Sequence, residues 1–421
     1  MGGDFRFSPS QRTIGAAMLA VKVLLMISFS SDYQDRLFIP FVKYFLTNLD
    51  NPWQHFHALH ADMFPYPPLM LYILSVAALP ANLLSESGIV WNLFFKLPTL
   101  AADLLIAGLL LRMFPSKVKE ILVFYFASPI ILYAAYMHSQ LDLLPMAVLV
   151  LSVYLLTSNR LPLSATVFGL AVSIKFHVAA ALPLMIVYVF RNHRKSSVLH
   201  FIFIPVLTYL AFSLPFLSEG YAEMVLRNSK QMMVFSSVFV IGDVKIYLPV
   251  FAVFTLYARF AAYPKINNDL LHTFLGMVFA TFVFFILPSP AWYVWIIPFL
   301  SIFFIQYYAR QKPILYLSLS LNFAYLLYYL CFHIADHHDL TLLGTPISLK
   351  IADERIRNVS FSALEVVLFA TIYSLYKFGV RSNEVYRRTH NLIIGIGGDS
   401  ASGKSTLLAD VKSILGSRLL D

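Results

Sequence analysis

Residues 92–113 read Asn-Leu-Phe-Phe-Lys-Leu-Pro-Thr-Leu-Ala-Ala-Asp-Leu-Leu-Ile-Ala-Gly-Leu-Leu-Leu-Arg-Met, and this stretch decides the fold class. Within it, only Lys96, Asp103 and Arg112 have ionisable side chains. A helix needs about 20 consecutive, mostly apolar residues to cross the hydrocarbon core of a bilayer. We therefore predict that residues 92–113 form a membrane-spanning helix.

Eleven further stretches are similarly apolar, and we predict a span for each. The composition agrees, because 59% of the residues are hydrophobic and 13% are charged. Soluble domains contain about 45–50% apolar residues and about 25% charged residues. The chain is therefore predicted to be an all-α polytopic membrane protein with about 12 transmembrane helices. The eleven stretches are residues 14–31, 120–138, 141–157, 161–175, 177–190, 199–217, 246–262, 269–287, 291–308, 313–333 and 360–380.

The basic residues indicate the orientation, since lysine and arginine concentrate in cytoplasmic loops. All the basic loops fall on one side only if Pro67–Leu84, an apolar stretch interrupted by prolines, is interfacial or re-entrant and does not cross. Both termini are then cytoplasmic, in a bacterial inner membrane or an endoplasmic reticulum membrane. This distribution accounts for the net charge of +9 without a nucleic acid partner, and membrane lipid is the expected partner. The basic loops are Arg112–Lys119, Arg191–Lys195, Arg259–Lys265, Arg310–Lys312 and Arg381–Arg388.

Most of the unusual polar residues then fall on the outer face. Asp32 and Asp35 follow the first predicted span directly, before an amphipathic segment, Leu37–Leu46, that we expect to form an interfacial helix. A partly desolvated carboxylate at this position suits a general base acting on a sugar hydroxyl. The alternative interpretation is a solvated helix end, with Arg36 as the ionic partner.

Other candidate binding residues lie at outer helix ends or close to them. Ionisable groups at membrane depth are functional candidates by default. Lys96 and Asp103 are seven residues apart and share a helix face, although Lys96 could instead snorkel to the interface. The further candidates are Tyr66, His138, Gln140, Asp142, Lys175, His177 and, in the second external segment, Arg227.

Taken in order along the chain, these elements resemble the GT-C superfamily of membrane glycosyltransferases. They are Asp32 after the first span, Tyr66-Pro67-Pro68-Leu69, Lys96-Leu97-Pro98 followed by Asp103, His138-Ser139-Gln140-Leu141-Asp142, and Lys175. The likeness covers roughly residues 10–380. It is nearest to the dolichyl-phosphate-glucose-dependent glucosyltransferases of the N-glycan pathway and their bacterial relatives. The predicted fold is therefore GT-C-like, with interfacial helices in the first external loop.

The resemblance implies a polyprenyl-phosphate sugar as donor and a glycan, lipid-linked or protein acceptor. It implies that Asp32, with Asp35 in reserve, is the base for an inverting transfer. Lys175, followed by His177 and His138, is the expected cation for the leaving phosphate. The chain departs from the family in one place, because Pro65 stands where an aspartate often precedes Tyr-Pro-Pro, and this departure leaves the acceptor class open.

No cofactor is strictly required for this chemistry, although a divalent metal is possible. Two histidine groups, His55/His57/His60 and His337/His338/Asp339, resemble metal-ligand patterns. The first three do not fit on one face of a regular element, so we expect interfacial histidines and no metal site.

The C-terminal segment carries a different motif. Gly398-Asp399-Ser400-Ala401-Ser402-Gly403-Lys404-Ser405-Thr406 matches the phosphate-binding loop G-x-x-x-x-G-K-[ST], between a β-like run and a helical pattern. In this pattern Lys404 reaches the β/γ-phosphates and Ser405 ligates Mg²⁺. The sequence of this segment, over about residues 391–420, resembles the uridine kinase and phosphoribulokinase family. A complete domain of that family would use Mg-ATP.

We therefore predict two domains, residues 1–380 and residues 381–421, the second a short β-P-loop-α fragment of an incomplete kinase domain without kinase activity. Two alternative functions remain open at this point. One is a polytopic lipid or solute transporter, or flippase, which intramembrane charges permit. The other is a membrane-anchored kinase of the uridine kinase type.

Overall fold

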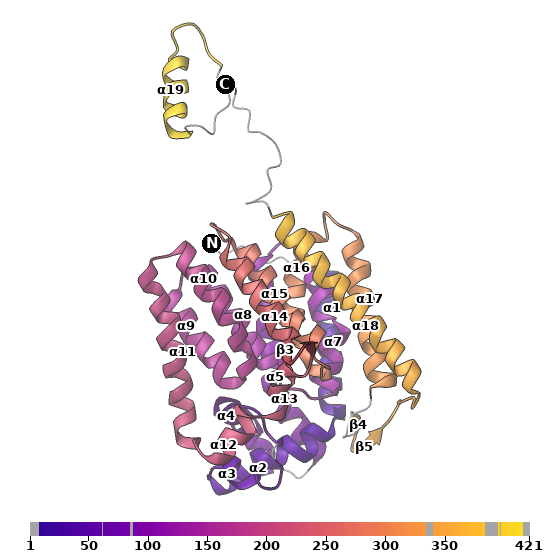
Figure 1. Cartoon of the computed structure of the whole chain (residues 1–421). Helices are drawn as coiled ribbons and strands as arrows, with labels where there is room; N and C mark the ends of the chain where they lie inside the picture. The colour runs from indigo at the N-terminus through magenta and orange to yellow at the C-terminus, as the bar shows by residue number, and fades with distance from the viewer. Residues whose placement is uncertain are drawn as a thin grey trace. The chain divides into compact units, whose positions relative to one another are not determined.

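A computed structural model describes residues 8–60, 62–84, 87–333, 340–383, 395 and 397–415 of the chain. The chain divides into two compact units, Met1–Asn383 and Glu384–Asp421. The first unit is a bundle of helices (Figure 1). The second is described through the loop before α19 (Lys404–Leu415) and that helix. The β-like run predicted before the phosphate-binding loop lies mostly outside the described residues.

Within the described ranges, six helices are long and apolar enough to cross a membrane, which confirms an all-α membrane protein. A seventh span results if Val118–Phe126 and Pro129–Met137, which meet at an angle of 40°, are one broken span. That pair comprises α6 (Val118–Ile121), η2 (Leu122–Phe126), α7 (Pro129–Ile131) and η3 (Leu132–Met137). The six are α1 (Pro9–Ser28), α5 (Gly88–Met113), Lys195–Phe216 around α11 (Val198–Ser213), α15 (Asn268–Phe285), Pro313–Phe332 containing α17 (Pro313–Leu327), and Glu354–Arg381 containing α18 (Glu354–Ser374).

The other five predicted spans correspond to shorter apolar helices, so the count of about 12 spans is not confirmed. Proline occupies the first turn of four of these helices, where its fixed φ suits a helix start. Pro68–Leu84 also forms a helix, α4, of similar length, with Pro80 inside it. The five are α8 (Leu143–Thr157), α9 (Leu161–Ile174), Phe176–Asn192 comprising η4 (Phe176–Ala181) and α10 (Leu182–Asn192), α14 (Leu248–Ala261) and α16 (Ile297–Tyr307).

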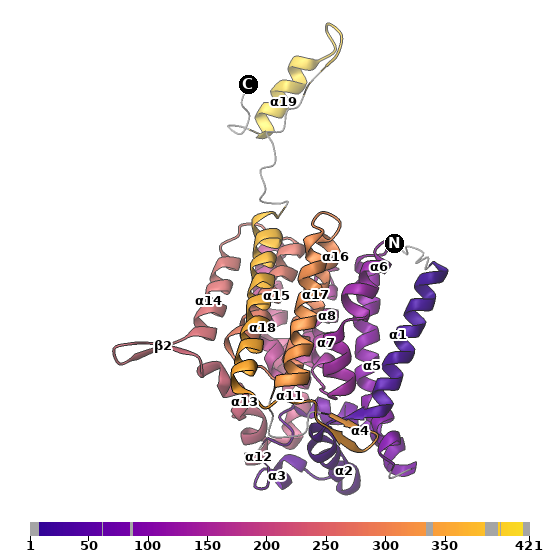
Figure 2. The same cartoon turned by 90° about the vertical axis from the view of Figure 1, so that its right-hand side faces the viewer.

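The two ends of the bundle differ in character. The start of helix α1 lies at the end of the bundle that is drawn uppermost in Figure 2. The segment that continues α18 finishes at this same end. The opposite end carries the segments that join the spans there (Figure 2). These are η1 (Tyr33–Phe38), α2 (Ile39–Asn48), α3 (Pro52–Phe56), α12 (Glu219–Tyr221), η7 (Ala222–Leu226), α13 (Ser229–Met232) and η8 (Met233–Phe235).

Aromatic packing joins the first of these segments into one layer. The predicted amphipathic helix is present as α2, and its buried Phe41 stacks on Phe64 with ring centroids 4.5 Å apart. Trp53 is fully buried, and its indole N–H donates to the carbonyl of Phe64 at 3.3 Å. At Gly220 an added Cβ would lie 2.3 Å from the Trp53 carbonyl oxygen, so only glycine allows α12 to pack so closely against α3.

Two small antiparallel sheets complete the described fold. In the first, β1 (Phe29–Ser30) pairs with β4 (Leu340–Leu342), which pairs with β5 (Thr345–Ile347). The second is an isolated hairpin of β2 (Val238–Ile241) and β3 (Val244–Tyr247). Between the last helices, η9 (Pro290–Trp295) precedes α16, η10 (Tyr328–Phe332) continues α17, and η11 (Leu375–Arg381) continues α18.

Candidate functional site

A cavity of about 220 Å³ lies where the loop segments meet the helix ends. One part of its wall is polar and cationic, and the rest is aromatic or aliphatic. It is therefore shaped for a ligand that has an anionic group and an apolar body. Its lining residues are Pro65, Lys175, Phe176, His177, Asn228, Lys230, Gln231, Val234, Phe282, Ile286, Trp292 and Trp295.

A second cavity, of about 20 Å³, shares Pro65, Lys175, Lys230 and Trp292 with the first and therefore adjoins it. Its wall brings together segments that are far apart in the sequence. Of the residues predicted as binding residues, Tyr66, Gln140, Asp142 and Lys175 line it, and His177 lines the larger cavity. The remaining residues of its wall are Tyr33, Phe38, Asp62 and Ser289.

Lys175 is held at the junction of the two cavities. It follows the last residue of α9 in an extended conformation, which ends the helix and directs the chain into η4. Its ammonium group forms an ion pair with Asp142 Oδ1 and lies 4.9 Å from the ring centroid of Tyr66. The other carboxylate oxygen of Asp142 is buried and has no hydrogen-bond partner among the described residues, so it is available to a ligand.

Lys230, in α13, is the second cation of the site, whereas Arg227 was the binding residue predicted in this segment. The Lys230 ammonium lies 4.9 Å from the ring centroid of Tyr33 and lines both cavities. Arg227 is exposed and lines neither of them. Arg227 caps the end of η7, and the chain turns at Asn228 before α13 begins, so Arg227 and Lys230 belong to different elements.

Asp62 fixes the position of α13. Its carboxylate accepts hydrogen bonds from the Asn228 amide at 2.8 Å and from the Ser229 hydroxyl at 3.0 Å. Burial, followed by the nearby ammonium of Lys175, lowers the pKa of Lys230, while Asp62 and Asp142 act in the opposite direction. Two ammonium groups facing the same space favour an anion between them.

His177 contributes its imidazole ring to the wall of the larger cavity. Its ring stacks on Trp295, with centroids 4.1 Å apart and planes at 18°. Both ring nitrogens are buried and lack hydrogen-bond partners within the described ranges. A buried polar group usually has a partner, so these nitrogens are suited to contact a bound ligand.

Asp32 and Asp35 lie at the start of η1, close to the cavities but outside their walls. Asp32 is buried, 6% exposed, and its Oδ1 lies 3.4 Å from Nε of Arg36. Asp35 accepts a hydrogen bond from the Ser30 hydroxyl at 2.6 Å. Asp35 is an exposed residue overall, but partial burial of its carboxyl group raises the pKa of that group. The hydrogen bond from Ser30 and the positive charge of Lys96 act in the opposite direction. Tyr33, between the two, lines the small cavity.

His138 is a positioning residue in this structure, and it lines neither cavity. Its backbone carbonyl accepts a hydrogen bond from the Ser31 hydroxyl at 2.7 Å, which ties the start of the aspartate-bearing loop to the end of η3. Its ring accepts from the Gln140 amide at 3.1 Å and packs against Tyr33, with centroids 5.6 Å apart.

Lys96 also has a structural role. Its ammonium is buried and donates to the carbonyls of Met26 (3.1 Å), Phe29 and Tyr136 (3.1 Å), at the ends of α1 and η3. These carbonyls are left unpaired where helices end, and the lysine satisfies them. Lys96 therefore does not snorkel to the interface, and it lines neither cavity.

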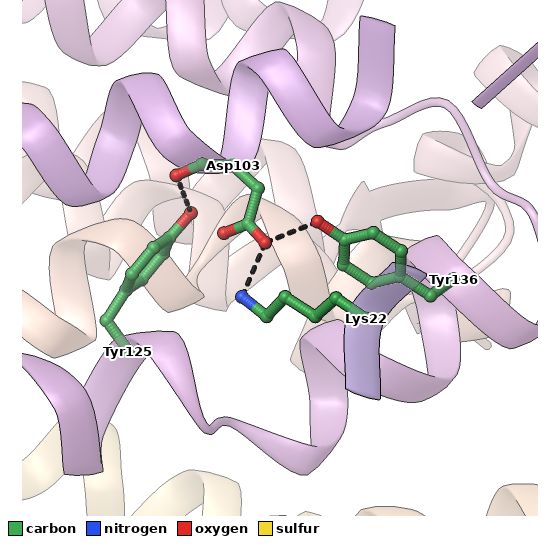
Figure 3. A network of polar contacts seen from close by, with 4 residues as sticks. All are labelled: Lys22, Asp103, Tyr125 and Tyr136. Carbon is green, nitrogen blue, oxygen red and sulfur yellow. Dashed lines mark hydrogen bonds and ion pairs between the residues drawn. The ribbon is translucent and has the colours of Figure 1, made fainter. Parts of the chain in front are cut away.

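Asp103 belongs to a separate buried network (Figure 3). Its Oδ2 accepts from the ammonium of Lys22 at 2.5 Å and from the hydroxyl of Tyr136 at 2.5 Å. The Tyr125 hydroxyl donates to the Asp103 backbone carbonyl at 3.4 Å. Lys22 and Asp103 have no exposed side-chain surface. The pair joins α1 to α5 and lines neither of the two cavities described above.

Among the described residues, no group of three or more His, Cys, Asp or Glu side chains is placed to hold a metal ion. His55 stacks on Tyr44 with centroids 4.1 Å apart, while His57 Nδ1 lies 3.3 Å from Glu223 Oε2. His337, His338 and Asp339 lie outside the described residues.

The phosphate-binding motif forms a compact loop before α19. Ala401 and Gly403 have positive φ values of 69° and 82°, which turn the chain back on itself. The Lys404 ammonium donates to the carbonyls of Gly398 and Asp399, the latter at 2.8 Å. Ser400 lies in the turn, Ser402 N–H donates to the Asp399 carbonyl at 3.2 Å, and Ser405 and Thr406 are exposed in the first turn of α19. The lysine and exposed hydroxyls thus lie around one loop.

A search of family models finds none that matches this chain, and a search of curated proteins also finds no match.

Proposed function

We propose that residues 1–380 form an inverting glycosyltransferase of the GT-C type, which transfers a hexose from a polyprenyl-phosphate donor to an acceptor hydroxyl. One observation carries the proposal. A cavity with two lysine ammonium groups and apolar walls lies beside a loop that bears Asp32 and Asp35. Such a cavity suits a lipid phosphate, and the adjoining carboxylates suit a base.

The proposal includes about 12 membrane crossings, with both termini in the cytoplasm and the site at the outer face. The start of α1 and the end of the segment that continues α18 lie at the same end of the bundle (Figure 2). An even number of crossings requires this arrangement. The loop segments with the candidate residues lie at the other end. The shorter helices would cross with help from the non-helical residues that flank them.

In the proposed complex the donor phosphate lies between Lys175 and Lys230. The start of the polyprenyl chain follows the apolar wall formed by Phe176, Phe282 and Ile286. The carboxylate of Asp142 holds the Lys175 ammonium in place, and the apolar surroundings strengthen both attractions to the phosphate.

The reaction then needs one proton acceptor and one stabilised leaving group. Asp32 takes the proton from the acceptor hydroxyl, whose oxygen attacks the anomeric carbon from the side opposite the phosphate. The bond between the anomeric carbon and the phosphate oxygen breaks, and its electron pair stays with the phosphate. Lys175 and Lys230 stabilise the charge that develops there, which is where fixed cations contribute most.

Replacing Lys230 with methionine is expected to weaken donor binding by about 10-fold to 100-fold, because a charge-assisted hydrogen bond contributes roughly 1.5–3 kcal/mol. Arg227→Met is the matched control, since it removes a cation three residues earlier that lines neither cavity. Binding of a short-chain polyprenyl-phosphate hexose to the purified protein is the measurement. Equal losses in both variants would contradict the role of Lys230.

The pH dependence of donor binding tests the same residue. Burial and Lys175 lower the pKa of Lys230, so its positive charge is lost at a lower pH than that of an ordinary lysine. Donor affinity is expected to be full below this lowered pKa and to fall as pH rises through it. In Lys230→Met this decrease should be absent, and an unchanged profile in that variant would argue against the assignment. Affinity titrations from neutral to alkaline pH give the comparison.

The tail has a second candidate function, binding of a nucleotide phosphate, which the loop geometry favours. The Lys404 ammonium lies over the loop, and α19 begins directly after it, so an anion would meet the lysine and a helix N-terminus together. We expect the chain to bind a fluorescent ATP analogue with Mg²⁺. Lys404→Ala should weaken that binding at least about 10-fold, while Lys230→Met should leave it unchanged. Equal binding by Lys404→Ala would exclude this function.

A further inference from the structure

The hairpin β2–β3 has an unusual surface for a two-stranded element. In the observed register Phe239 pairs with Ile246 and Ile241 pairs with Val244, so these four apolar side chains share one face. Phe239 is 58% exposed and Val244 is 66% exposed. The other face carries Val238, Val240, Lys245 and Tyr247, and the turn between the strands is Gly242-Asp243.

The described part of the chain leaves most of both faces of the hairpin uncovered, with partial cover at Ile246 and a ring contact between Tyr247 and Phe235. A sheet in water ordinarily buries its apolar face against a core. An isolated two-stranded hairpin is only marginally stable in water, and an exposed apolar strand is prone to aggregate. The apolar face therefore requires a covering medium.

The position of the hairpin indicates what that medium is. In Figure 2 it projects sideways from the bundle, across the direction of the long helices, and so extends in the plane of a surrounding bilayer. Helix α14 follows it directly and exposes Phe251 and Phe254, the latter by 66%, as a lipid-facing helix would. The apolar surface of the hairpin thus continues the surface that meets lipid.

The two faces of the hairpin differ, and this difference indicates how deeply the hairpin lies in the membrane. A hairpin in the hydrocarbon core would leave the N–H and C=O groups of its outer edges without partners, which is costly. At the headgroup layer, water and lipid headgroups satisfy those edges. Lys245 and Tyr247 on one face suit the headgroups, while Phe239, Ile241, Val244 and Ile246 suit the acyl chains.

We propose that the β2–β3 hairpin lies flat in the headgroup layer of the membrane, with the face formed by Phe239, Ile241, Val244 and Ile246 against the acyl chains. Its base borders the larger cavity, because Gln231 and Val234 line that cavity shortly before β2. The Ser237 hydroxyl donates to the carbonyl of Phe285, next to the cavity residue Ile286. The hairpin thus sets the depth at which the apolar wall of the cavity meets lipid. This inference does not depend on the proposed reaction.

Site-specific labelling tests the proposal in the full chain. Cys331 is the only cysteine, so a Cys331→Ser background allows one label at a time. Phe239→Cys, Ile241→Cys and Val244→Cys report on one face, and Val238→Cys and Val240→Cys on the other. Ser116→Cys, exposed in the loop between α5 and α6, is the control in water. Each variant is labelled with an environment-sensitive fluorophore and reconstituted in phosphatidylcholine vesicles, with nitroxide-labelled lipid or aqueous iodide as quencher.

Labels at 239, 241 and 244 are expected to be quenched several-fold more by acyl-chain nitroxide than the label at 116, and to be protected from iodide. Labels at 238 and 240 should be quenched less by lipid and more by iodide, which gives an alternation with a period of two. Iodide quenching at 239 and 241 as strong as at 116 would place the hairpin in water and overturn the proposal. Protection of both faces from both quenchers would overturn it in favour of a protein covering.

Discussion

Asp103→Leu is expected to lower the free energy of unfolding by about 3–5 kcal/mol, because it leaves a buried ammonium group without its counter-charge. In the native protein the Lys22 ammonium lies 2.5 Å from Asp103 Oδ2 and 3.6 Å from the ring centroid of Phe126. The aromatic ring alone does not replace the carboxylate, since a cation–π contact contributes roughly 0.5–2 kcal/mol. Reversible denaturation in bicelles, followed by tryptophan fluorescence, measures the loss.

The matched control is the double variant Lys22→Met/Asp103→Leu. Replacing both members of a buried ion pair with apolar residues of similar volume is often neutral or stabilising. We expect the double variant to recover most of the stability that Asp103→Leu loses. The intermediate case is Tyr136→Phe, which removes only the 2.5 Å hydrogen bond to Asp103 and should lower stability by about 1.5–3 kcal/mol. Wild-type stability in Asp103→Leu would contradict the buried pair.

Asp32→Asn is expected to lower sugar transfer by about 100-fold to 10,000-fold, the usual contribution of a general base. Asparagine keeps the size of the side chain but cannot take the acceptor proton. Donor binding should change little, because Lys175 and Lys230 hold the phosphate. The assay is transfer from a panel of polyprenyl-phosphate sugars by reconstituted protein, with the free energy of unfolding measured in parallel to exclude a folding defect.

Three further variants make this test specific. Asp50→Asn changes an exposed acid of the same loop and should leave transfer unaffected. Asp35→Asn and Asp142→Asn address two further carboxylates at or beside the cavities. A large loss in Asp35→Asn, with Asp32→Asn active, would transfer the role of base to Asp35. Asp142→Asn should weaken donor binding, since it removes the partner of Lys175. Full activity in all four variants would exclude the proposed site.

Prediction from the sequence succeeded where the signal was local. Each predicted span corresponds to an apolar helix or a bent pair of helices, because length and hydropathy are properties of a contiguous stretch. The same reasoning did not give helix lengths, which depend on prolines and on packing at the ends. Eight residues were proposed as one binding group. Of these, Tyr66, Gln140, Asp142, Lys175 and His177 line the two cavities, whereas Lys96, His138 and Arg227 line neither. That they bind a phosphate sugar stays a prediction.

Three lysines show where local reasoning fails. Lys22 is the single ionisable residue in the first predicted span, and that isolation was a usable signal, but its partner Asp103 is 81 residues away. Lys96 was proposed as a ligand-binding residue or an interfacial one, yet it satisfies carbonyls at two helix ends. Arg227 was the binding residue predicted in the second external segment, yet of Arg227 and Lys230 only Lys230 lines the cavity, after the turn at Asn228.

Residues 92–113 and the similar apolar stretches are enough to establish an all-α membrane protein, since transfer of a long apolar segment out of water dominates its free energy wherever it lies. Which charges face a ligand and which neutralise one another depends on contacts between distant segments. Lys22 and Lys175 are both lysines paired with aspartates, but one is sealed between α1 and α5 while the other borders a cavity. Only tertiary packing distinguishes them, because electrostatic and hydrogen-bond energies depend on positions in space and not on spacing along the chain.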